Sequence, residues 1–466
     1  MSQHSNLELV FRTPQEIQSS KTTLDQWKND QARIGALQTL SVRSRNRKPD
    51  GLAYQDLINS LIKFFESGKS RLPSFQTLKW EVDKEFPPSL LRIFETNHPS
   101  WTIHLHNTPD SIAVLSSPAV TSLTVELRQE YISENKAALS NVQSAIQSLK
   151  TLKRLHLYVN VHGCAHYSYS TDFPENGGTF PPLEELVLEW FKITQKGGEY
   201  WLRAMDWSHL RVLDFREGSI STPFLLLLLP IADKLPALES LGLNLPFWKE
   251  EDVRDQRNDP HSSFSLTRQL FLTAQPQSLR DVRIQGYYRS LLPDILDRHG
   301  ASLKSLSLHE TETSSQNNQR IPLSLEELQE IWTKSTGLEG LALDVNISKG
   351  HKWPENIVGT IASSRFSSLG KLTVFSLIGI SGEMIQQPNG ERGFAPATTE
   401  EDARSLSSSL SATPLKEITV RIGEERTIRG RPAYFVLWEN NNRKVLTMSR
   451  EKDGWVLSSI RTGHEI

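Results

Sequence analysis

The sequence predicts an α/β fold in which many short parallel strands stack side by side, each followed by a helical or irregular return segment. The phrase L-x-x-L-x-L recurs along the chain, for example at Leu152, Leu155 and Leu157. Its fourth and sixth positions alternate with polar residues, which is typical of a strand with one buried face. Several segments between these phrases have helical spacing. Because one such strand cannot bury its leucines alone, neighbouring strands must share a continuous core.

The repeated phrase gives about thirteen degenerate units. Clear copies begin at Leu152, Leu183, Leu238, Leu303 and Leu338, altered copies at Leu210, Leu279, Leu369 and Leu415, and weaker copies at Leu37, Phe75, Ser100 and Val120. Apolar residues at helical spacing predict return helices over 135–150, 288–299 and 323–335. The apolar run from Phe224 to Ala232 is interpreted as another return helix, ended by Pro230.

The units define a repeat array over residues 31–425, preceded by an N-terminal cap or tail at 1–30. Loop insertions are expected near 163–180, 249–261, 310–320 and 386–402. The last of these is rich in glycine, proline and acidic residues, so it is predicted to be a mobile loop. Residues 426–466 are predicted to cap the array with a β-hairpin, whose strands are Tyr434 to Trp438 and Val445 to Met448.

Composition excludes several classes of partner. The chain has 466 residues and a formal net charge of −2, so it offers no strong field to nucleic acid or anionic lipid. Its longest apolar run is far short of the ~20 residues of a membrane helix. Cys164 is the only cysteine, which fits a reducing compartment. We therefore expect a cytoplasmic or nuclear monomer without nucleic-acid or membrane partners.

From about Leu37 to Arg421, the units resemble the leucine-rich-repeat family. The family's fuller motif places Asn three residues after the last leucine, as at Asn160 and Asn346. The resemblance implies a solenoid with a curved parallel sheet, in which these two amides are buried and bond backbone groups of adjacent turns.

The irregular spacing is most similar to the arrays of fungal F-box proteins, which are substrate receptors of ubiquitin ligases. Thr13 to Ile17 imitates the opening of an F-box, but the residues that follow are polar and the first repeat begins near Leu37. The chain thus resembles the substrate-binding half of such a protein without the half that docks to the ligase.

No motif in the sequence supports catalysis or a cofactor. Gly68-Lys69-Ser70 lacks the preceding glycine of a phosphate-binding loop. The run from His162 to His166 offers three possible metal ligands, where structural zinc needs four. His104 and His106 alternate with apolar residues and are interpreted as solvated residues on the polar side of a strand. The sequence therefore predicts a protein that is not an enzyme and holds no cofactor and no metal.

The remaining candidate site is the polar side of the strands, which would be the concave face of the solenoid. Residues between and beside the buried leucines point there because strand side chains alternate. The predicted partner-binding residues are Arg154, His156, Tyr158, Glu185, Glu189, Asp214, Arg216, Asn244, Asp281, Arg283, Gln285 and His309. Among them Arg154, Tyr158, Arg216 and Arg283 are expected to contribute most, since Arg and Tyr are favoured at binding hot spots.

Three functions stay open on the sequence alone. The first is a protein-interaction module related to F-box substrate receptors, with the loops or the convex side as alternative binding surfaces. The second is a stand-alone structural scaffold unrelated to ubiquitin ligases. The third is an enzyme built on the loops, which no motif supports.

Overall fold

The described part of the chain is an α/β structure with a mostly parallel β-sheet, which confirms the predicted class and strand direction. In this computed structural model, the described residues are 6–44, 51–66, 72–82, 84–107, 112–128, 136–160, 170–216, 222–245, 254, 256, 259–275, 278–310, 322–345, 347, 352–363, 366–376, 379–386, 392–396, 398–423, 443–452 and 454–462.

Two compact units divide these residues, 6–160 with 170–213 in the first and 214–462 in the second. The strands of the first unit are β1 (Asn6–Phe11), β2 (Thr39–Ser44), β3 (Thr77–Glu81), β4 (Thr102–His106), β5 (Val120–Arg128), β6 (Arg154–Asn160) and β7 (Glu185–Glu189). Its helices are α1 (Pro14–Asn29), α2 (Gln31–Ala36), α3 (Leu52–Glu66), α4 (Pro88–Thr96), α5 (Ile112–Leu115), α7 (Lys136–Ser148), α8 (Gln195–Ala204) and the 3-10 helix η1 (Trp207–His209).

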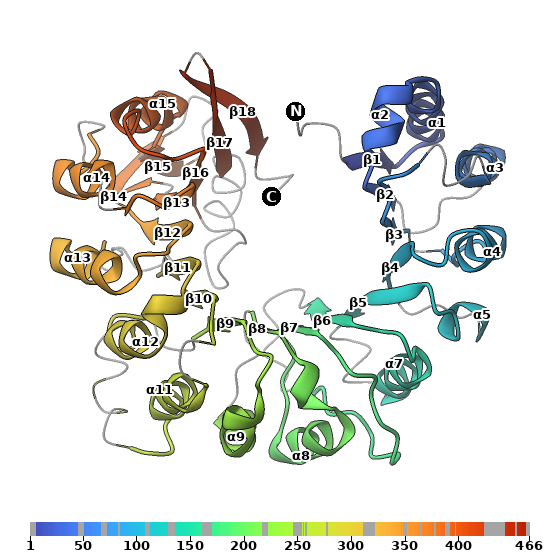
Figure 1. Cartoon of the computed structure of the whole chain (residues 1–466), viewed down its shortest axis with the longest axis horizontal. Coiled ribbons are helices and arrows are strands. Elements are labelled where there is room, and N and C mark those ends of the chain that lie inside the picture. Colours follow the sequence, from blue (N-terminus) through green and yellow to red (C-terminus); the bar gives the residue numbers. More distant parts are fainter. Residues whose placement is uncertain are drawn as a thin grey trace. The chain divides into compact units, whose positions relative to one another are not determined.

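In the first unit, β1 to β7 pair in parallel and in chain order. Leu40 lies beside Leu78, and Leu78 lies beside Ile103, so equivalent motif positions stack from strand to strand. Helices α1, α3, α4 and α7 lie along one face of these strands, on the blue-to-green side of Figure 1. Strand β1 extends the sheet beyond the first predicted unit, inside the segment predicted to be a cap or tail.

Strand β8 (Val212–Phe215) contains the point at which the two units divide. The parallel strands of the second unit are β9 (Ser240–Asn244), β10 (Asp281–Gln285), β11 (Ser305–His309), β12 (Gly340–Asp344), β13 (Lys371–Ser376) and β16 (Glu417–Ile422). Its helices are α9 (Thr222–Leu228), α11 (Ser263–Thr273), α12 (Leu292–His299), α13 (Leu325–Lys334), α14 (Glu355–Ala362) and α15 (Glu400–Ser409), with 3-10 helices η2 (Leu229–Lys234) and η3 (Gly300–Ser302).

The C-terminal strands of the second unit differ from the predicted hairpin. β17 (Lys444–Glu451) includes the predicted Val445 to Met448 and pairs antiparallel with β16 on one side. On its other side it pairs antiparallel with β18 (Gly454–Thr462), a strand that the sequence analysis did not contain. The other predicted hairpin strand, 434–438, lies outside the described residues.

The segment 386–402, which was predicted to be a loop insertion, contains regular elements where the structure describes it. β14 (Gly379–Gln386) and β15 (Arg392–Pro396) form an antiparallel pair. Helix α15 begins after Thr399, whose hydroxyl accepts from Asp402 N in a capping box. The glycines and prolines that predicted a loop include Gly393 and Pro396, which lie within β15. Most of the predicted insertions 249–261 and 310–320 lies outside the described residues.

The leucines of the repeated phrase make the core. A strand lies at each of the thirteen predicted positions, and the fourth and sixth residues of every copy are at most 2% exposed. The first position is buried as well, except at Ser100, where Trp101 is buried instead and stacks on His98 with ring centroids 3.6 Å apart. The weakest predicted copy is therefore anchored one residue later, by a larger side chain.

Local signals explain where two helices begin and end. Thr13 to Ile17, which imitates an F-box, is the capping box of α1, with Thr13 and Glu16 each accepting from the other's backbone N–H. The apolar run from Phe224 ends its α-helix at Leu228, and a 3-10 turn containing Pro230 follows. A proline removes one helical hydrogen bond, so the change of helix type falls where the sequence predicts it.

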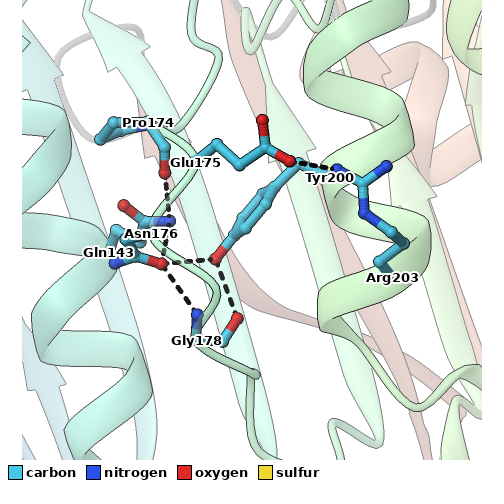
Figure 2. A network of polar contacts seen from close by, with 7 residues as sticks. All are labelled: Gln143, Pro174, Glu175, Asn176, Gly178, Tyr200 and Arg203. Carbon is cyan, nitrogen blue, oxygen red and sulfur yellow. Dashed lines mark hydrogen bonds and ion pairs between the residues drawn. The ribbon is translucent and has the colours of Figure 1, made fainter.

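The described part of the insertion near 163–180 is fixed to two helices of the first unit, as Figure 2 shows. Gln143 on α7 donates to Pro174 O at 2.8 Å, and the Tyr200 hydroxyl on α8 donates to Gly178 O at 3.2 Å. Arg203 on α8 pairs with Glu175 at 2.7 Å. Phe173 and Phe180 pack against Trp201 beneath this network, so residues 170–180 form an ordered strap and not a loose loop.

Candidate functional site

The candidate site is the strand face, by which we mean the strand positions that alternate with the buried core residues, on the side opposite the helices. Every predicted partner-binding residue lies on a strand or directly after one. The structure assigns five of them to the first unit and seven to the second. They are therefore described as two separate groups, Arg154, His156, Tyr158, Glu185 and Glu189, then Asp214, Arg216, Asn244, Asp281, Arg283, Gln285 and His309.

In the first unit, Tyr158 is the centre of an aromatic and acidic group. Its register neighbours are Glu126 on β5 and Glu189 on β7. The rings of His106 and His156 have centroids 6.3 and 5.6 Å from that of Tyr158. His156 Nε2 lies 3.7 Å from the buried carboxylate of Glu189. The group presents a half-buried tyrosine edged by imidazoles, with carboxylates on both neighbouring strands.

His104 is not the solvated residue that the alternation predicted. Its Nδ1 lies 2.5 Å from Ser122 Oγ, and its Nε2 lies 3.2 Å from Thr124 Oγ1, both on β5. Burial lowers the pKa of His104 to about 4, although the charge of Glu81 opposes that shift. The ring is consequently neutral at pH 7, and it joins two strands instead of facing solvent.

Arg154, the first of the predicted hot-spot residues, is the most exposed member of this group. Its side chain is 65% exposed, and its Nε lies 3.8 Å from the carboxylate of Glu185. A pair of this length at the surface holds neither partner rigidly. Arg154 and Glu185 are therefore accessible but loosely positioned.

In the second unit, two predicted arginines meet at one carboxylate. Arg216 Nε donates to Asp214 Oδ2 at 2.9 Å, and Arg283 Nη2 donates to Asp214 Oδ1. Asp214 is on β8 and Arg283 is on β10, and the strand between them carries Gly242 in register with Arg283. A Cβ on Gly242 would lie 2.0 Å from Asp214 Oδ1, so only glycine leaves room for this contact.

The other second-unit residues surround this pair. Asn244 and Gln285 are register partners on β9 and β10, and both are half-buried. Asp281 stands two residues before Arg283 on the same face, and its carboxylate accepts from Ser240 Oγ at 3.2 Å. The structure thus brings together two guanidiniums, two amides and two carboxylates on adjacent strands.

His309 is placed differently from the prediction, because it is buried. Its Nδ1 lies 2.8 Å from Oδ1 of Asp344, a residue with no exposed surface, and its ring stacks on Phe375 at 4.0 Å. Asp344 Oδ2 also accepts from the backbone N–H of Glu310 at 2.6 Å. A buried carboxylate requires such partners, so the His309–Asp344 pair satisfies polar groups inside the sheet and offers little surface to a ligand.

The asparagines of the repeat motif were expected at strand exits with bonds to backbone. Asn160 is half-buried, and its Nδ2 donates to a side chain, Glu126 Oε1 at 2.5 Å, instead of to backbone. Asn346 lies outside the described residues. A strand-exit amide that the sequence analysis missed is Asn107, which accepts from Glu126 N and has a φ of 69°. Asparagine tolerates this left-handed conformation, which is the signal that could have identified it.

Two other segments were considered for chemistry on the sequence, one for its similarity to a phosphate-binding loop and one for its possible metal ligands. Residues 68–70 and 162–166 lie outside the described residues. Within the described residues no cluster of three or more His, Cys, Asp or Glu side chains is arranged to hold a metal ion. Nor does any described helix have the length and apolar content needed to span a bilayer.

A pocket of about 480 Å³ lies on the helical side of the second unit, away from every predicted site residue. Its walls include Phe264, Arg268 and Leu272 on α11, together with Ser290. Arg268 donates to Asp294 from Nε at 2.5 Å and from Nη2 at 3.1 Å. This arginine is exposed and carboxylate-bound, so it offers a matched comparison for the arginines of the strand face.

Comparison of the chain with models of known protein families and with curated proteins found no match.

Proposed function

We propose that this chain is a non-catalytic protein-interaction module of the leucine-rich-repeat type, working in the cytoplasm or nucleus and related to the substrate-binding half of fungal F-box proteins. The observation that carries the proposal is the strand face. Within each unit, side chains with large contact area or charge stand on parallel strands, Tyr158 in register with Glu189 in the first unit and Arg283 in register with Gly242 in the second, while helices cover the other side. Arg and Tyr on a rigid sheet are suited to binding because little conformational entropy is lost.

The repeat assignment is supported because each copy of the L-x-x-L-x-L phrase coincides with a strand. The two alternating leucines of each copy are buried, and each strand is followed by a return segment. Stacked units of this kind expose one long row of polar positions, which is the feature that repeat proteins use to hold other proteins. The proposal also accounts for polar residues on a strand face that the core does not need.

The experiment is affinity purification of the full chain from its native cell, with partners identified by mass spectrometry. Four variants, Arg154→Ala, Tyr158→Ala, Arg216→Ala and Arg283→Ala, are then compared with the parent for binding of each recovered partner. One or two of them should weaken binding by about 1 kcal/mol or more, because interface energy concentrates in few residues. The fold should survive, since surface changes usually shift stability by about 0.5 kcal/mol or less.

Matched controls come from arginines on the helical side. Arg203 on α8 and Arg268 on α11 are exposed, and they pair with the carboxylates of Glu175 and Asp294. Arg203→Ala and Arg268→Ala should leave binding unchanged. If the controls weaken binding while the four strand-face variants bind normally, recognition belongs to the helical side. If no variant changes the binding of any partner, a stand-alone scaffold is the better account.

A further inference from the structure

The contact between Arg283 on β10 and Asp214 on β8 requires that residue 242, on the strand between them, has no side chain. Arg283 reaches past its own neighbouring strand to bond Asp214 on the next one, and its Nη2 lies 3.3 Å from the place where a Gly242 Cβ would stand. A long side chain crossing a strand in this way loses rotamer freedom before any ligand arrives. The guanidinium of Arg283 is therefore held in place.

Most of the donor capacity of Arg283 is unused within the described residues. It bonds Asp214 through Nη2 alone, and its side chain is 34% exposed. A guanidinium carries five N–H donors in a planar fork, which matches the two oxygens of a carboxylate. Arg216 and Arg283 bond different oxygens of the Asp214 carboxylate, so Arg283 shares its counter-charge with a second guanidinium.

An amide stands next to this cation. Asn244 lies two residues after Gly242 on β9 and is half-buried, and its side-chain amide has no hydrogen-bond partner among the described residues. A side-chain amide offers both a donor and an acceptor, which is what the main chain of an extended peptide needs. Ser307 on β11 is in register with Arg283, and its small side chain leaves room beside the guanidinium.

Asp281 limits where an acidic group can lie. Its carboxylate is on the same face of β10, two residues before Arg283, and it repels another anion. A ligand carboxylate is therefore favoured on the Asn244 side of Arg283 and disfavoured on the Asp281 side. This asymmetry would give an extended ligand a preferred direction.

We propose that the strand face of β8 to β10 binds an extended acidic segment of a partner protein, with an Asp or Glu side chain on Arg283 and the peptide backbone on Asn244. The inference deepens and rests on the proposed interaction function. Arg216 bonds the other oxygen of the Asp214 carboxylate. Gly242 and Asp214 are positioning residues, since they hold Arg283 and need not touch the ligand.

The test selects displayed random peptides of about ten residues against the full chain, long enough to cross the strands in extended form. Enriched peptides are synthesised, and their affinities are measured by fluorescence anisotropy. Acidic sequences should be enriched, and Arg283→Gln should weaken them about tenfold or more, since it removes a charged fork worth at least one hydrogen-bonded pair. Arg283→Lys should recover only part, because it restores the charge without the fork.

Arg268→Gln is the matched control and should change affinity by less than about twofold. Circular dichroism of each variant verifies the fold. If the enriched peptides show no excess of acid, or bind Arg283→Gln as tightly as the parent, the acidic-segment proposal is wrong even where the purified partners still depend on Tyr158 or Arg154. If no strand-face variant affects any partner, the proposed function itself fails, and the two failures are thus distinguishable.

Discussion

The strand faces of the two units carry side chains of different size. In the first unit the face carries His104, His156 and Tyr158, and each bulky ring contacts side chains on the next strand or its own. In the second unit the middle row carries Gly242, Ser307 and Ala342, and a long side chain can pass over it. The missing side chain at Gly242 lets Arg283 reach a carboxylate two strands away, whereas the hydroxyls of Ser122 and Thr124 hold the His104 ring against the next strand.

The difference teaches that alternation along a strand does not by itself define a surface. Both units have the same period of two, yet the His104 ring is bonded to two side chains of the next strand while most donors of Arg283 stay unused within the described residues. The exposure of each strand-face residue is set by the residues beside it in register. The predictions that follow test this dependence, first at buried charge, then at the bridging histidine, the glycine and the exposed arginine.

The largest effect is expected for Asp344→Ala in the second unit. The change leaves His309 and the backbone N–H of Glu310 without their buried acceptor, which costs about 3–5 kcal/mol of unfolding free energy. Urea denaturation measures the loss. Asp281→Ala, which removes a half-buried carboxylate with one bond from Ser240, should cost about 1 kcal/mol or less. Equal losses in the two variants would contradict the conclusion that Asp344 holds buried groups of the folded sheet.

The second effect is a pH dependence of stability that originates in the first unit. The pKa of His104 is near 4 in the folded chain and 6.5 in the unfolded chain, because burial disfavours the charged ring. The contribution of His104 is therefore complete above pH 6.5 and is lost as pH falls toward 4, since only the unfolded chain takes up the proton. The loss is at most about 3 kcal/mol.

Urea denaturation at pH 7 and pH 4.5 checks this dependence against His104→Asn, which can still bond the hydroxyls of β5. Between the two pH values, the variant should lose less stability than the parent. His299, whose pKa is also lowered by burial, titrates in both proteins and cancels in the comparison. Parallel pH profiles would mean that the His104 ring takes up its proton without cost.

A smaller effect is expected for Gly242→Ala. Its Cβ would meet Asp214 Oδ1 at 2.0 Å and displace the carboxylate from both arginines, which costs about 1–3 kcal/mol. Gly340→Ala is the matched control, because its nearest neighbour would be Ser305 Oγ at 3.7 Å. That change should stay within about 0.5 kcal/mol. Thermal denaturation of both variants decides whether the strand-face glycines differ as the geometry requires.

The smallest effect is expected for Arg154→Ala. The guanidinium is exposed and 3.8 Å from Glu185, so its loss should change the unfolding free energy by about 0.5 kcal/mol or less. Chemical denaturation at low and high salt should give the same small difference. A loss above about 1 kcal/mol would show that Arg154 stabilises the fold, and its substitution could then not be used to measure binding alone.

The strands could be predicted from the sequence because buried positions repeat locally. Leu155 and Leu157 alternate with polar residues, and that alternation predicts which strand positions face the core. β1 was missed because Leu7, Leu9 and Phe11 follow a different phrase, although the same alternation is present there. β14 and β15 were missed because their glycines and prolines indicate turns as readily as strand ends.

The candidate site could be predicted only in part. Alternation placed Asp214, Arg216 and Arg283 on the strand face, but it could not show that Arg283 bonds a residue two strands away. That contact depends on register and on the empty position at Gly242, which are properties of the assembled sheet. The burial of His309 depended in the same way on Asp344 and Phe375, each from a strand later in the chain.

The order in which the strands pair has a consequence for synthesis on the ribosome. Within the first unit each strand from β2 to β7 pairs with the one translated just before it, so its docking edge already exists when it emerges. Such a sheet can grow as it is made, without waiting for distant segments. In the second unit β16 takes its second neighbour from β17, which is translated after it. A ribosome stalled before β17 would therefore expose an unpaired strand edge, the part of a sheet most prone to join another chain.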